Sequence, residues 1–316
     1  MSVLAVVTIA TGCKKNDNTP SFSSFNTLTD EAISDFVNKI ALTGYSELKS
    51  KALVFNNLII QLNNDPSTTN LTAARTAWKD MRLTWEKCEG FLFGPIEDHE
   101  YDPETDTWPL NYVDMDAVLN NPSQPLSVTD IAAFSRALKG YHPIEYILWG
   151  EGGTRTAADL TARQKEYMVS LSALLKENAD ALYDAWNPSA GNYANTFLSA
   201  GKGSSVFIKK QDAFNSIVQG LMDICEEVGA GKMKEPYDLF LSNPALAVQS
   251  VESPFSGNSI TDFKNNIIGA YQVYLGNFNN DGVGLEDLVK ERNSALDIEL
   301  QQKFNIAIQS FNAITD

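Results

Sequence analysis

The chain has 316 residues and a formal net charge of −16, from 24 Lys and Arg against 40 Asp and Glu. Hydrophobic residues make up 43% of it, which is ordinary for a globular protein and excludes a largely disordered chain. The length suffices for about two domains. The acidic balance argues against a nucleic-acid partner and favours cations.

The first thirteen residues predict a lipoprotein signal. Residues 3–10 are apolar, and a small Thr-Gly pair precedes Cys13, which we expect to be the lipidated first residue of the mature protein. The match to the lipobox is loose, and no Lys or Arg precedes the apolar run, which indicates a truncated start. The run is also too short to span a membrane, and the alternative is an ordinary apolar N-terminus. Residues 14–27 then form a polar tether, so we expect a bacterial envelope protein anchored on the periplasmic side or at the cell surface.

Helical periodicity dominates the rest of the chain. Apolar residues recur at i, i+3, i+4 and i+7, which places one apolar stripe on each helix, and no segment shows the alternation of a strand. Residues 94–111 and 187–204 read as irregular. The expected helices lie around residues 33–41, 52–62, 74–88, 113–119, 128–138, 167–186, 214–228, 260–274 and 296–314.

These elements predict an all-α fold of two antiparallel, four-helix-bundle-like halves. The glycines at 150–153 suggest a junction, so residues 28–150 form the expected N-terminal bundle and residues 151–316 the C-terminal bundle. No strict sequence repeat relates the two halves.

The segment Gly140-Tyr-His-Pro-Ile-Glu145 carries the sharpest chemical signal. Pro143 is tolerated in the first turn of a helix, so the helix is expected to start at this proline, after Gly140. His142 and Glu145 then lie on one face, where imidazole and carboxylate suit Zn²⁺ or iron. The alternative is a locally bonded histidine with a first-turn acid. Two ligands are too few, so others must come from elsewhere in the fold.

A second cluster lies on the expected helix at 74–88. Arg82 and Glu86 are one turn apart and could form a surface ion pair. Glu89 follows next to apolar residues, where a carboxylate requires a partner or a metal ion.

The motifs resemble those of the imelysin family, the group of the insulin-cleaving membrane protease. Gly140–Glu145 is similar to its G-x-H-x-x-E motif, and the helix ending in Phe-Leu-Phe-Gly-Pro95 is similar to the segment before it. Residues 106–109 (Asp-Thr-Trp-Pro) and 252–256 (Glu-Ser-Pro-Phe-Ser), followed by Asp262 and Asn266, also match the family pattern. The likeness covers roughly residues 27–316.

This resemblance implies an all-α fold with a site between two bundle-like halves and with the motif His and Glu as metal ligands. It implies His142 and Glu145 as the motif ligands, and Glu89 and Asp106 as supporting acidic groups. Family members are envelope proteins or lipoproteins, many of them tied to iron acquisition, and some were classed as metallopeptidases. The sequence supplies no second motif histidine and no complete catalytic set.

We therefore expect an envelope lipoprotein that binds a divalent metal or iron, or a metal chelate, and serves iron uptake. The alternatives are a metal-dependent peptidase and a helical interaction scaffold with a vestigial site. Other motifs do not add a site: His99-Glu100 lacks a second histidine because Pro103 stands in its place, and residues 277–288 copy only half of an EF-hand loop. Cys88 and Cys225 are expected to be buried thiols, although the sequence leaves a disulfide open.

Overall fold

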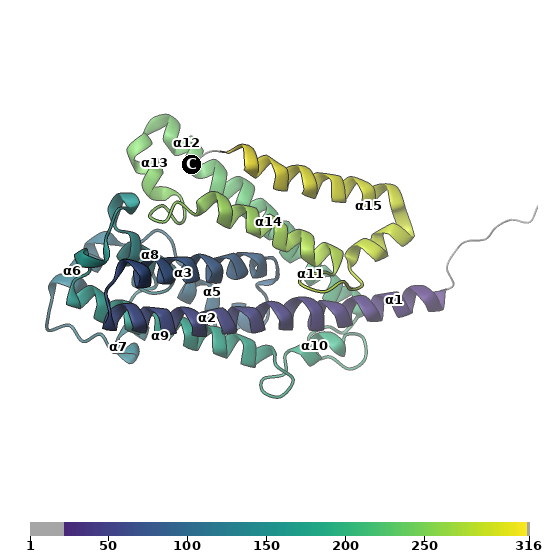
Figure 1. Cartoon of the computed structure of the whole chain (residues 1–316). Coiled ribbons are helices and arrows are strands. Elements are labelled where there is room, and N and C mark those ends of the chain that lie inside the picture. Colours follow the sequence, from purple (N-terminus) through teal and green to yellow (C-terminus); the bar gives the residue numbers. More distant parts are fainter. Residues whose placement is uncertain (1–21, 315–316) are drawn as a thin grey trace, which may run out of the picture.

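A computed structural model describes residues 22–314, and within this range the chain forms helices and no strand. The first layer contains one long continuous helix made of α1 (Phe22–Asp35), the π-helical η1 (Phe36–Ala41) and α2 (Leu42–Asn64) (Figure 1). It continues with α3 (Thr68–Cys88), the 3₁₀ turn η2 (Glu89–Phe91), α4 (Pro95–Asp98), α5 (Tyr101–Thr105), α6 (Tyr112–Asn120), α7 (Val128–Ala132), η3 (Arg136–Leu138), α8 (Tyr141–Trp149), η4 (Glu151–Gly153), η5 (Ala157–Asp159) and α9 (Ala162–Trp186).

The second layer lies against one side of the first (Figure 1) and begins after the short helix α10 (Ala194–Leu198). It contains α11 (Lys210–Glu226), the π-helical η6 (Glu227–Lys234), α12 (Glu235–Ser242), α13 (Pro244–Ser250), α14 (Ser259–Leu275), α15 (Leu285–Ser310) and η7 (Phe311–Ala313). Figure 1 shows α12 and α13 as an arch that extends from one end of this layer. Helix α15 is kinked at Asn293, whose backbone is not helical.

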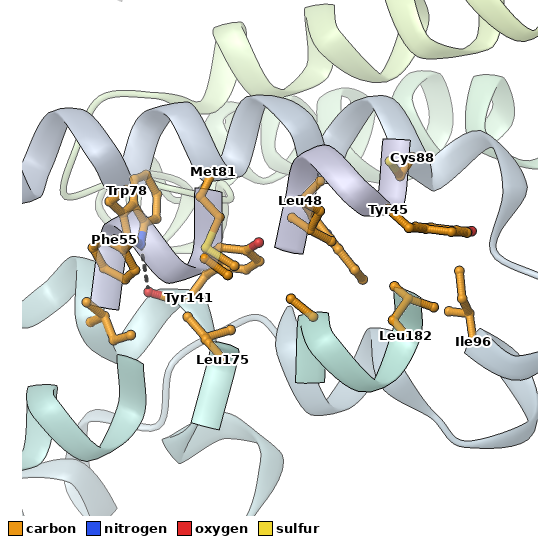
Figure 2. Close-up of a cluster of buried hydrophobic side chains, with 14 of the residues drawn as sticks. Tyr45, Leu48, Phe55, Trp78, Met81, Cys88, Ile96, Tyr141, Leu175 and Leu182 are labelled. Carbon is orange, nitrogen blue, oxygen red and sulfur yellow. Dashed lines mark hydrogen bonds between the residues drawn. The ribbon is translucent and has the colours of Figure 1, made fainter. Parts of the chain in front are cut away.

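Large apolar side chains hold the first layer together. Figure 2 shows side chains of α2, α3 and α9 converging on a common core, with Phe55, Trp78 and Leu175 among them. The indole nitrogen of Trp78 donates a hydrogen bond to the Tyr141 carbonyl at 3.2 Å, which ties α8 to α3. Burial of such side chains stabilises by about 1.5–3 kcal/mol each, so this core fixes where α3 and α8 lie.

Helix α3 belongs to both layers. It packs against α2 on one side and against α14 on the other. Helix α9 packs mainly on α2, so the predicted division at residue 150 does not separate the packing partners of the first layer. The buried apolar residues of both layers form one connected core.

The all-α prediction is confirmed, and most of the expected helices are present. The differences lie in short elements. The helix expected at 128–138 is split into α7 and η3, and α4, α5 and α10 lie in segments expected to be irregular. Helices α12 and α13 were not predicted. Among the described residues, none of the helices is long and apolar enough to cross a membrane.

The close contact between α3 and α14 depends on a glycine. A Cβ added at Gly269 of α14 would lie 2.3 Å from the Lys87 carbonyl oxygen, at the end of α3. The helix backbones therefore approach more closely than a side chain permits.

We expect Gly269→Ala to lower the free energy of unfolding by about 1–3 kcal/mol, because the added methyl group overpacks this contact. Chemical denaturation monitored by circular dichroism measures the change. The matched control is Gly229→Ala, since a Cβ at that helical glycine meets nothing within 4 Å. An equal effect of the two substitutions would contradict the steric explanation.

Candidate metal centre

A fully buried arginine lies at the contact between the two layers. Arg82 of α3 forms ion pairs with Glu86 one turn later, with Asp106 after α5 and with Glu252 after α13. Asp262 of α14 lies 3.6 Å from the same guanidinium. The surface ion pair considered for Arg82 and Glu86 is therefore wrong, because both side chains are fully buried. A charge buried this deeply requires such compensation.

The motif histidine lies beside this cluster. His142 Nε2 lies 3.1 Å from Asp106 Oδ1, although the two groups are not aligned for a hydrogen bond and Nε2 has no other partner. On the opposite side of the ring, Nδ1 lies 3.2 Å from Glu145 Oε2. The other oxygen of Glu145 accepts hydrogen bonds from the Ser256 backbone N–H at 2.8 Å and hydroxyl at 2.7 Å. Glu145 therefore lies behind the ring, where it orients His142.

The start of α8 explains the glycine of the motif. Gly140 has a φ of +87°, and a Cβ there would lie 2.1 Å from the Thr105 carbonyl oxygen. The absence of a side chain thus allows α8 to begin directly against the residue before Asp106. The helix starts at Tyr141 rather than at the predicted Pro143, which occupies its first turn, where a missing N–H costs nothing.

Two further carboxylates share an amide and a lysine. The Asn266 side-chain nitrogen donates to Glu86 Oε2 at 2.7 Å and to Glu89 Oε2 at 2.6 Å. Lys232 of η6 approaches the same pair, with Nζ 3.0 Å from Glu89 Oε2 and 3.8 Å from Glu86 Oε2, and it also lies 3.1 Å from Glu252 Oε2. Asn266 and Lys232 are thus the partners that Glu89 was predicted to need in its apolar surroundings.

Nearby hydroxyl, amide and indole groups orient the acids. Asp262 accepts hydrogen bonds from the Ser253 hydroxyl at 2.6 Å and from the Asn258 amide at 2.6 Å. Asp106 Oδ2 accepts one from the Trp85 indole N–H at 2.6 Å. These donors fix the carboxylates without neutralising their charge.

Burial and neighbouring charges shift the acidity of the cluster. Burial raises the pKa of Glu86 and Glu89 well above the ordinary value, and the nearby Arg82 and Lys232 offset this only in part. Burial also raises the pKa of Asp106, but Arg82 and His142 outweigh it and hold this pKa well below its usual range. Burial lowers the pKa of His142, but the Asp106 and Glu145 carboxylates raise it by a larger amount, so that it reaches about 9.

The cluster opens into an acidic cavity of about 380 Å³. Residues of α5, η6, α12 and the segment after α13 line this cavity, which therefore lies where the two layers meet. The lining residues are Glu89, Asp102, Asp106, Trp108, Glu227, Gly231, Lys232, Glu235, Pro236, Leu239, Ser250 and Glu252.

Two sets of side chains in the described range could hold a metal ion. The ligand atoms of Asp106, His142 and Glu252 lie within 4.8 Å of one another, as do those of Glu86, Glu89 and Asp106. The first set fits a transition metal better, because it combines an imidazole with two carboxylates and because the buried His142 Nε2 lacks a hydrogen-bond partner. Asp106 belongs to both sets.

Comparison with known proteins identifies the family. The imelysin model, also designated peptidase M75, matches residues 41–316. The chain belongs to the imelysin family. The predicted resemblance is thereby confirmed.

A relative and two solved structures agree with this membership. Iron-regulated protein A of Synechococcus elongatus is 29% identical over 92% of this chain and 77% of its own. A structure described as an iron-regulated protein A precursor from Parabacteroides distasonis superposes with a TM-score of 0.85 at 23% identity, covering 95% of this chain and 88% of the other. An imelysin-like protein from Psychrobacter arcticum gives a TM-score of 0.70 at 15% identity, covering 92% and 85%. These structures establish a shared imelysin fold.

The structure thus brings together three of the residues expected in an imelysin site, His142, Asp106 and Glu89, and places Glu145 behind the histidine. It leaves their role as metal ligands a prediction. Glu252 was noted only as part of the family pattern, and nothing in the sequence around Lys232 indicated a role for it. The lipidation prediction for Cys13 lies outside the described residues. Cys88 is a buried free thiol as expected, whereas Cys225 is a free thiol that is only half-buried.

The acidic cavity of this imelysin-family protein disfavours the charged form of Asp102, one of the residues that line it. Burial, together with Asp106 and Glu227, raises the pKa of Asp102 to about 7. The folded state therefore binds more protons than the unfolded chain between about pH 4 and 7, and stability falls as pH rises through this window.

We expect Asp102→Asn to raise the free energy of unfolding of chelator-treated protein by about 1–2 kcal/mol at pH 8, after allowance for solvent screening. The gain should fade as pH falls from 7 to 4. Denaturant titration at several pH values measures it, and the exposed Asp116→Asn serves as control. A gain that persists unchanged at pH 4 would refute the electrostatic cause.

Proposed function

We propose that this imelysin-family protein binds iron, or another divalent metal ion, as its cargo between the two helical layers, with Asp106, His142 and Glu252 as ligands. The observation that carries the proposal is the buried His142 Nε2, which lies among carboxylates and has no aligned hydrogen-bond partner, although Asp106 Oδ1 is 3.1 Å away. A metal ion between this nitrogen and the carboxylates would give both a well-aligned partner.

The donor set suits the proposed cargo. One imidazole and two carboxylates are typical of sites for Fe²⁺, Mn²⁺ and Zn²⁺. Glu145 contacts the ring nitrogen opposite Nε2, which is the usual arrangement of a carboxylate that orients a ligating histidine. We therefore assign Glu145 a positioning role in place of the ligand role implied by the motif alone.

Metal binding requires only the ligand set, whereas peptide hydrolysis also requires a base, for which Asp102 of the cavity wall is the available carboxylate. A metallopeptidase needs a carboxylate free to accept a proton from the metal-bound water. The remaining buried carboxylates near the ligands already contact partners: Glu86 and Glu89 contact Asn266, Glu145 contacts Ser256, and Asp262 contacts Ser253.

The link to iron comes from a relative. The similar protein of Synechococcus elongatus bears the name iron-regulated protein A. Together with a net charge of −16, which attracts cations, this supports a role in iron uptake. We further propose that Cys13 anchors the protein to the bacterial cell envelope, from the apolar run that precedes it.

His142→Ala is expected to weaken Fe²⁺ and Zn²⁺ binding at least 100-fold, because it removes the imidazole ligand. Isothermal titration of metal-free protein under anaerobic conditions, with elemental analysis, measures this. The matched control is His99→Ala, the other histidine of the chain, which lies at the exposed end of α4. Wild-type protein that stays metal-free with every ion would refute the proposed function, and equal loss in the two variants would refute the site.

Cys13→Ala is expected to abolish incorporation of a labelled fatty acid in cells that express the chain behind a complete lipoprotein signal. Label and membrane fractionation together measure anchoring. Cys225→Ala should keep the label, because this half-buried thiol lies on α11. Unlabelled wild type, or equal label on the Cys13 variant, would contradict the anchor.

A further inference from the structure

One basic side chain extends into the acidic cavity from the second layer. Lys232 Nζ lies 3.0 Å from Glu89 Oε2, 3.1 Å from Glu252 Oε2 and 3.8 Å from Glu86 Oε2. Its side chain is only 11% exposed. The ammonium group is thus a cation that the lysine side chain itself holds among the carboxylates.

The ammonium group shares one carboxylate, Glu252, with the proposed metal ligands. A metal bound to Glu252 lies about 2.0–2.5 Å from a carboxylate oxygen. One Glu252 oxygen contacts Arg82 and the other contacts Lys232, so neither is free. A metal ion and an ammonium group at the same carboxylate repel each other strongly in a buried site.

We propose that Lys232 is an internal cation that occupies the acidic cavity of the metal-free protein and that an entering metal ion displaces it toward solvent. This inference rests on the proposed metal-binding function and adds a residue that controls it. Arg82 cannot serve in this way, because its side chain is fully enclosed and it pairs with acids on several sides.

The surroundings of Lys232 allow it to leave. Glycines 229 and 231 precede it in η6, and a Cβ at Gly229 would meet nothing within 4 Å, so there is open space beside this part of the helix. Glu227 lies 3.7 Å from Nζ and its side chain is 56% exposed. The displaced ammonium thus has a partner at the solvent edge of the cavity, within reach of a flexible side chain.

Displacement by exchange also gives selectivity. When a monovalent ion replaces the ammonium group, the charge in the cavity stays the same. A divalent ion adds one positive charge to a cluster in which carboxylates outnumber basic groups. Displacement of Lys232 therefore favours divalent over monovalent ions at this site.

The first experiment titrates Mn²⁺ into chelator-treated wild type, Lys232→Met and Lys234→Met. Methionine keeps most of the length of the side chain and removes the competing charge, so Lys232→Met should bind Mn²⁺ at least ten-fold more tightly. Lys234→Met should match wild type, because Lys234 pairs with Asp238 on the exposed side of the helix. Equal or weaker binding by folded Lys232→Met would overturn the inference.

The second experiment requires no variant. Acetic anhydride labels accessible amines of the wild-type protein, and mass spectrometry measures each lysine with and without saturating Mn²⁺. Lys232 should be protected without metal and become several-fold more reactive with it, whereas the exposed Lys234 should not change. A Lys232 that stays protected in the metal-bound protein would overturn displacement.

The outcomes separate the two proposals. If wild type binds Mn²⁺ and His142→Ala does not, but Lys232 behaves like Lys234 in both experiments, the proposed function stands and this inference fails. If neither wild type nor Lys232→Met binds Mn²⁺, both fail. Binding by Lys232→Met alone would also overturn displacement, because the metal ion then fails to move the lysine of the wild-type protein.

Discussion

The buried charge of Arg82 is the constraint on which the rest of the site depends. Its guanidinium lies in the contact between the two helical layers and contacts acids from α3, from the segment after α5 and from the segment after α13. Removal of a buried partner costs about 3–5 kcal/mol, so these segments are held to one arrangement. The acids that could bind a metal ion are also the acids that compensate Arg82, and folding and binding therefore share the same groups.

The site is not local to any motif. His142 comes from α8, Asp106 from the segment after α5, Glu252 from the segment after α13, and Lys232 from η6. The glycines at 140 and 269 permit the two close backbone approaches that bring these parts together. The motif histidine alone thus specifies little. Its chemistry arises from acids that lie far from it in the sequence.

This explains how much could be predicted from the sequence. The long helices were predictable, since their apolar periodicity reflects burial on one face. His142 and its glycine were predictable from spacing, and Asp106 and Glu89 only through the family resemblance. Lys232 and the burial of Arg82 were not, because both depend on tertiary contacts between segments more than 140 residues apart. Helices α12 and α13 escaped prediction because their apolar side chains are largely exposed and show no buried stripe.

The small buried surface of the arch of α12 and α13 affects access to the cavity beside it. Helix α12 buries none of its residues and packs chiefly on α13 and η6, yet it supplies part of the cavity wall through Pro236 and Leu239. Segments with so little buried surface open at a small fraction of the free energy of global unfolding. The arch can therefore open at a lower free-energy cost than α3, which packs against both layers and keeps its arginine in place.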